Sequence, residues 1–72
     1  MTKSEIVETL RCAADLCWET IVPVRAACLM TGASMSVVVP AFEAALGRPR
    51  SRDVVQLHVD LLEAAQRIEE SK

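Results

Sequence analysis

The sequence has few of the residues on which catalytic and cofactor sites depend. It contains two glycines, one histidine, no tyrosine and only 3% aromatic residues. Two isolated glycines exclude a glycine-rich loop that cradles phosphate. The single histidine, His58, has no nucleophile at a recognisable spacing, so we interpret it as the edge of a helix face, hydrogen-bonded to a carboxylate or to the backbone. We therefore expect no enzymatic activity and no cofactor.

The cysteines are also too few and too widely spaced for a metal site or a disulfide framework. They are Cys12, Cys17 and Cys28, an odd number, and no two of them have the close spacing of zinc ligands. We interpret them as packed or idle thiols, with Cys12 on the polar side of its helix. The start of the chain has no features of a secretory leader, so we expect a reducing, cytoplasmic setting.

No hydrophobic run is long enough to cross a membrane. The longest uncharged stretch extends from Ala26 to Phe42 and is interrupted by Gly32, Ser34 and Ser36. A transmembrane helix needs roughly 20 consecutive apolar residues. We therefore expect a soluble protein that does not bind membranes.

What the chain does contain is a large share of apolar residues for its size. Of its 72 residues 51% are hydrophobic, and its formal net charge is -2. The length allows one domain, residues 1–72, and so small a domain buries only about 60% of the surface that its unfolded chain exposes. Trp18 and Phe42 are expected to pack together in the core. With disulfides, metal and membrane set aside, sharing a core with a second chain is the remaining route to stability, so we expect a homodimer.

Apolar residues at helical spacing predict a first helix from Ser4 to Thr20. Its apolar face comprises Ile6, Val7, Leu10, Ala13, Ala14, Cys17, Trp18 and Ile21. Ser4 is the expected N-cap. Pro23 is expected to begin a second helix, because a proline at the first position loses no helix hydrogen bond. That helix is expected to end near Thr31, before Gly32 in a left-handed conformation.

The segment from Ser34 to Val39 has two interpretations. Three consecutive valines before Pro40 are compatible with an extended segment, and the helix would then begin only at the proline. A serine cap before an apolar pattern instead predicts a helix from Ser34 to Leu46 with a distorted first turn, and we favour this interpretation. Gly47 ends the helix in either case.

A final helix is predicted after the loop of residues 47–52, with Ser51 as its N-cap. Its polar stripe comprises Gln56, Asp60, Glu63, Arg67 and Glu70, and its apolar positions are Val54, Val55, Leu57, His58, Val59, Leu61, Leu62, Ala65 and Ile68. This apolar arc is wider than one neighbouring helix can cover, which favours contact with a second chain. The predicted dimer or partner interface comprises Val55, Val59, Leu62, Val37 and Val39.

Between Val24 and Ala65 a short helix, a glycine turn and two further helices are expected in succession. The residues of this pattern are Gly32 in the turn, Ser34 after it, Val38, Ala41 and Phe42 on the inward side of the next helix, Gly47-Arg48-Pro49, and then Leu57 and Leu61. The pattern resembles the lambda-repressor-like helix-turn-helix family. The resemblance implies that the helix after the turn lies in the DNA major groove, and it makes a dimeric DNA-binding repressor the alternative function.

The outward positions of that helix do not suit DNA. They are Met35, Ser36, Val39, Pro40 and Glu43, none of which is cationic. Base edges are read by hydrogen-bonding side chains and phosphates are met by cations, and a net charge of -2 adds no general attraction. The opposing feature is the series Arg48, Arg50 and Arg52, which either contacts an anion or an acidic partner or lies in a solvated loop.

Together these patterns predict an all-α protein, a small bundle of four short helices that is helix-turn-helix-like and dimeric. The absence of catalytic patterns and the excess of apolar helix surface predict a regulatory or adaptor protein that binds another protein. Inhibitors, anti-activators and antitoxin-like neutralisers act in this way. Nucleic acid is the disfavoured partner, and the residues do not identify the protein partner.

Overall fold

The computed structural model describes residues 2–16, 23–49 and 53–71. These ranges form four α-helices and contain no strand, which confirms the predicted all-α fold. The helices are α1 (Lys3–Leu16), α2 (Pro23–Thr31), α3 (Met35–Leu46) and α4 (Val54–Glu70). The predicted continuation of the first helix to Thr20, with Cys17 and the contact between Trp18 and Phe42, lies outside the described residues. In the described ranges no helix is both long enough and apolar enough to cross a bilayer.

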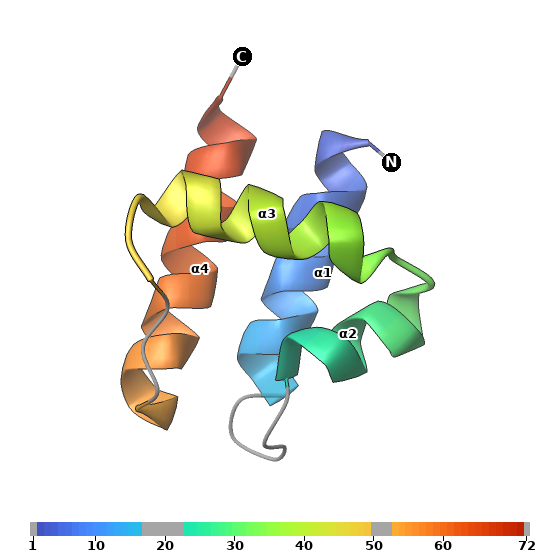
Figure 1. Ribbon diagram of the computed structural model, residues 1–72, viewed down its shortest axis with the longest axis horizontal. Helices are drawn as coiled ribbons and strands as arrows, with labels where there is room; N and C mark the ends of the chain where they lie inside the picture. The colour runs from blue at the N-terminus through green and yellow to red at the C-terminus, as the bar shows by residue number, and fades with distance from the viewer. Residues whose placement is uncertain (1, 17–22, 50–52, 72) are drawn as a thin grey trace.

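Helices α1 and α4 lie side by side and antiparallel, and α3 crosses over both (Figure 1). At one end of the pair the Lys3 ammonium donates to the carbonyl of Ser71. At the other end His58 Nδ1 lies 2.7 Å from the carbonyl oxygen of Ala14, which is the backbone partner predicted for this histidine. Helix α2 packs against α1 and α3, so that α1 is the central element of the bundle.

The start of α1 differs from its prediction, because the N-cap is Thr2 and not Ser4. The Thr2 hydroxyl oxygen accepts from the Glu5 backbone N–H at 3.2 Å. The Glu5 carboxylate in turn accepts from the Thr2 backbone N–H at 3.2 Å and from the Thr2 hydroxyl at 2.9 Å. This reciprocal arrangement, a capping box, satisfies two backbone donors that a helix start otherwise leaves unpaired.

The start of α4 is also displaced from its prediction, because Asp53 is the N-cap and not Ser51. The Asp53 carboxylate accepts from the backbone N–H groups of Val55 at 2.9 Å and Gln56 at 3.2 Å. An aspartate cap also places negative charge at the positive end of the helix dipole. Both capping errors have the same cause, since more than one residue near each helix start is able to cap it.

The first residues of α3, for which the sequence allowed a helical or an extended interpretation, are helical. Ser34 is an extended N-cap, and its carbonyl accepts from the N–H groups of both Val37 and Val38, at 3.1 and 3.0 Å, which is the distorted first turn. Pro40 lies inside the helix and has no N–H, so it removes one helix hydrogen bond. Gly47 ends the helix with φ 72°, in the left-handed region that favours glycine.

All four helices contribute to one core. Its buried residues are Val7, Leu10, Ala13 and Ala14 of α1, Val24, Ala27 and Cys28 of α2, Val38, Phe42 and Leu46 of α3, and Leu61, Ala64 and Ala65 of α4. Phe42 is fully buried, as its prediction as a core residue requires. Alanine accounts for four of the seven buried apolar residues in α1 and α4. Small side chains therefore form much of the core on these two helices.

Candidate protein-binding surfaces

An apolar stripe on α4 remains exposed to solvent. Val55 is 59% exposed, Val59 49% and Leu62 42%, and we call these three residues the α4 ridge. Their spacing of four and three residues places them along one side of the helix. The opposite side carries Asp60 and Ala64, which are buried. The excess of apolar surface expected at these three positions is therefore observed.

The two α3 residues of the predicted interface differ from each other. Val37 is 39% exposed. Val39 is half-buried and packs against the core, which corrects its predicted place on an exposed face. The difference follows from the rotation of about 100° between successive helix residues, which turns Val38 fully inward and leaves Val39 at the edge of the buried side.

The arginine series is represented in the described ranges by Arg48 alone, because Arg50 and Arg52 lie outside them. Arg48 Nη2 lies 2.8 Å from Asp60 Oδ1 and 3.4 Å from Glu63 Oε2. The hydrogen bond with Asp60 raises the pKa of the Arg48 guanidinium. Arg48 therefore joins the loop after α3 to α4, and its charge is already paired within the protein.

Asp60 lies in the interior, which corrects its predicted place on a solvated stripe. It is fully buried, and it accepts a second hydrogen bond from Gln56 Nε2 at 2.9 Å. A carboxylate is tolerated in a protein interior only where charge and hydrogen-bond donors are supplied, as Arg48 and Gln56 do here. Helical periodicity alone placed Asp60 in solvent, because the pattern carries no information about a salt bridge to a residue twelve positions earlier.

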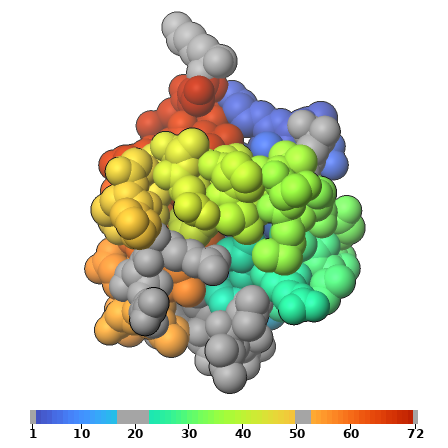
Figure 2. Space-filling model, in the orientation of Figure 1, coloured from blue at the N-terminus to red at the C-terminus, as the bar shows by residue number. Residues whose placement is uncertain are grey.

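The outward side of α3, which forms a band across the face of the molecule in Figure 2, has no cationic residue. Its exposed residues are Met35, Ser36, Val37, Pro40, Glu43 and Ala44. Arg67 of α4 donates to the carbonyl oxygens of Ala45 and Leu46 at the C-terminal end of α3, at 3.0 and 3.3 Å. This face offers no described group that would neutralise a phosphate.

The described thiols are packed. Cys28 is buried, and burial raises the pKa of its thiol. Cys12, which we predicted on the polar side of its helix, is half-buried and packs against the core. Within the described ranges no three histidine, cysteine, aspartate or glutamate side chains come together in a way that could hold a metal ion.

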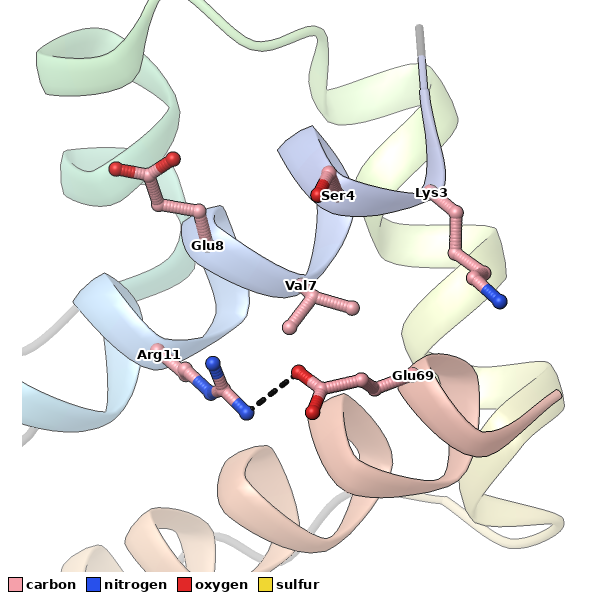
Figure 3. Close-up of a pocket in the computed structure, with 6 residues that line it drawn as sticks. All are labelled: Lys3, Ser4, Val7, Glu8, Arg11 and Glu69. Carbon is pink, nitrogen blue, oxygen red and sulfur yellow. Dashed lines mark hydrogen bonds and ion pairs between the residues drawn. The ribbon is translucent and has the colours of Figure 1, made fainter.

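Two shallow grooves flank α1. The α1–α4 groove, of about 390 Å³, is lined by Lys3, Ser4, Val7, Glu8, Arg11 and Glu69 (Figure 3). It is crossed by an ion pair between Arg11 Nη2 and Glu69 Oε2 at 2.7 Å, in which both side chains are 55% exposed. So exposed a pair contributes little stability, on the order of 0–1 kcal/mol.

The α1–α2 groove lies on another side of α1 and combines acidic with apolar groups. It has a volume of about 270 Å³ and is lined by Glu5, Glu8, Thr9, Met30, Thr31 and Ala33. Met30 is 70% exposed, and its neighbour Leu29 is 79% exposed. Sequence reasoning missed this groove, although two large apolar residues at the end of an otherwise small-residue helix were a usable signal.

These surfaces offer apolar contact and carboxylates, which are the means of binding another macromolecule. In the described ranges they present no pairing of a nucleophile with a base. Comparison with family models, curated proteins and solved structures finds no match for this chain.

Proposed function

We propose that the protein is a small non-enzymatic regulatory or adaptor protein that acts by binding another protein and that functions as a homodimer. The observation that carries the proposal is the α4 ridge, in which three aliphatic side chains remain about half exposed on a helix whose opposite side packs against the core. Covering such surface contributes about 25 cal/mol per Å². Contiguous apolar patches of this kind mark interaction sites in small proteins.

An antiparallel pairing of two α4 helices fits the ridge best. With a two-fold axis beside Val59, Val55 of one copy faces Leu62 of the other, and Val59 meets its own counterpart. The positions that continue the stripe toward the C-terminus are Gln66 and Glu69. A parallel pairing would bring each Glu69 against its counterpart, with like charges in contact, whereas the antiparallel pairing keeps them apart.

The paired state of most cations supports a protein partner over DNA. Of the five lysines and arginines in the described ranges, Lys3, Arg11, Arg48 and Arg67 each donate to an oxygen of the protein itself, and Arg25 of α2 is exposed. Non-specific DNA affinity depends on cations that are available to neutralise phosphates. The succession of α2, the turn at Gly32 and α3 fits the helix-turn-helix order, so a dimeric DNA-binding repressor is the second candidate.

Sedimentation equilibrium tests the homodimer. Val59→Asp should raise the dimer dissociation constant at least about 100-fold, because two carboxylates would meet in an apolar seam. Val59→Ala should raise it by roughly tenfold or less, since only methyl groups are lost. Leu29→Asp is the matched control, because it adds the same charge on α2, which does not contact α4, and it should leave the constant unchanged. A wild-type protein that stays monomeric at micromolar concentration would remove the proposed seam.

A salt-titrated binding assay on generic duplex DNA separates the two candidates. We expect no measurable affinity at about 50 mM salt, where phosphate-directed binding is strongest. Binding that weakens steeply with added salt, and that disappears when Arg48, Arg50 and Arg52 are all replaced by alanine, would establish the DNA-binding candidate in its place.

A further inference from the structure

The polar groups of the α1–α2 groove are arranged as hydrogen-bond acceptors. Thr9 is 1% exposed and forms part of the floor. Its hydroxyl donates to the Glu5 carbonyl at 2.8 Å, and the Thr31 hydroxyl donates to the Ala27 carbonyl at 2.8 Å. The two hydroxyl oxygens are 3.3 Å apart, and either hydroxyl is able to donate to the other. Because Thr9 is buried and Thr31 is exposed, Thr31 is the hydroxyl that presents an acceptor oxygen at the groove surface.

The two glutamates at the rim add carboxylate oxygens as acceptors. Among the described residues Glu8 has no hydrogen-bond or ion-pair partner. Figure 3 shows its carboxylate turned away from the ion pair of Arg11 and Glu69, on the side of α1 where α2 lies. Glu5 uses Oε1 to accept from Thr2, and this hydrogen bond lowers the pKa of the Glu5 carboxyl. The Glu5 and Glu8 carboxylates are therefore not paired with the lysine and arginine of the α1–α4 groove.

The remaining wall of the groove is apolar. Met30 and Ala33 line it, and the Met30 thioether is flexible and adapts to the shape of what it contacts. A lysine or arginine side chain joins a long aliphatic stem to a cationic donor group, and it buries the stem on apolar surface while its head meets acceptors. That combination matches the groove, in which an apolar wall lies beside a rim of carboxylates.

We infer that the α1–α2 groove is the docking site for a lysine or arginine side chain from a basic, amphipathic segment of the partner protein. The inference rests on the proposed function, since it assumes that the chain binds another protein. Apolar residues of the same segment would lie on Leu29, which adjoins the groove and is the most exposed large apolar residue in the described ranges. None of the ridge residues lines the groove, and α2, which supplies Met30 and Thr31 to it, does not contact α4, so partner and second copy can bind together.

An NMR titration of the full chain tests the inference, with a synthetic helical peptide of leucine, lysine and alanine as the probe. The same peptide with glutamate in place of lysine is the matched probe. We expect saturable shifts of the backbone amides of Glu8, Thr9, Thr31 and Ala33 and of the Met30 methyl group, with the lysine peptide only. Shifts spread over the surface, or equal shifts with the glutamate peptide, would overturn the inference.

Two variants of groove residues and one control variant test whether peptide binding is specific to the groove. Glu8→Gln should weaken peptide binding roughly fivefold, and Met30→Ala roughly threefold. Asp15→Asn removes the same charge from an exposed position of α1 outside the groove and should change binding by less than about twofold. Equal effects of the two charge variants would mean general attraction to an acidic protein, and calcium chloride that reproduces the shifts at lower concentration would mean a cation site. Either result excludes a docking groove.

The same titration in the Val59→Asp variant distinguishes this inference from the homodimer proposal. Because Val59 is not among the residues that line the groove, the peptide should bind a monomeric variant with unchanged affinity. If the wild-type protein binds the peptide but does not self-associate, the docking inference holds without the homodimer. If it self-associates but does not bind the peptide, the homodimer proposal holds without the docking inference. Loss of peptide binding on Val59→Asp would overturn the separation of the two surfaces.

Discussion

Both sides of α4 carry aliphatic residues, but one side is buried in the core and the other is exposed to solvent. On the inner side Leu61 is fully buried, and on the outer side its neighbour Leu62 is 42% exposed and Val59 49%. Hydrophobicity does not distinguish these residues. The difference is that α1 and α3 pack on one side of α4 only, and a chain of 72 residues has no further helix in the described ranges for the other side. An apolar residue in so small a protein is thus buried by its neighbours and not by its own chemistry.

The adjacent leucines give the largest expected difference. Leu61→Ala should lower the free energy of unfolding by about 3 kcal/mol, because it removes buried methyl groups and leaves a cavity. Leu62→Ala should lower it by less than about 1 kcal/mol, since much of this side chain is already in water. Urea denaturation of both variants in the Val59→Asp background, followed by circular dichroism, measures the effect on a single subunit. Equal losses would mean that the ridge is covered within one chain.

The charged residue on the inner side of α4 gives the next largest effect. Arg48→Met should destabilise the protein by about 2 kcal/mol, because it removes the guanidinium that lies 2.8 Å from the buried Asp60 carboxylate. The value is below that of a fully enclosed pair because Arg48 is 46% exposed. Arg11→Met is the control, as it breaks the exposed pair with Glu69, and it should change stability by less than about 0.5 kcal/mol. If the control has the larger effect in urea denaturation, Asp60 is satisfied without Arg48.

The smallest effect is expected at the exposed carboxylate of Glu5. The hydrogen bonds from Thr2 lower its pKa in the folded state, so the ionised form favours folding. Wild type should therefore exceed Glu5→Gln in thermal midpoint at neutral pH, and the difference should disappear as the pH falls through the lowered pKa. In a Thr2→Val background the difference should show less pH dependence. A constant difference across the titration would mean that the charge of Glu5 has no part in it.

The helices themselves were predictable from local patterns. Pro23 and Gly32 bound α2 as predicted, and Gly47 ends α3, because each residue restricts or frees its own backbone angles. The caps were harder to predict, since Thr2 competes with Ser4 and Asp53 with Ser51. The choice between them depends on geometry within a single turn, which residue identity alone does not determine.

Surfaces were predicted less evenly. Exposure of the α4 ridge followed from an apolar arc too wide for one neighbour. Asp60 and Val39 were misplaced because their burial depends on Arg48 and on the rest of the core, which are distant along the chain. The α1–α2 groove was missed for the same reason, because it forms only where residues more than twenty positions apart meet.

The sequence by itself determined that the described ranges form four helices, where α2 begins and ends, and that apolar residues of α4 remain exposed. Those properties depend on interactions within one or two helical turns and on composition. Only the tertiary structure decided that Asp60 is internal, that Arg48 is paired, and that Glu8 and Met30 share a groove. These outcomes depend on which helices pack together, because burial and charge pairing are properties of contacts between distant parts of the chain.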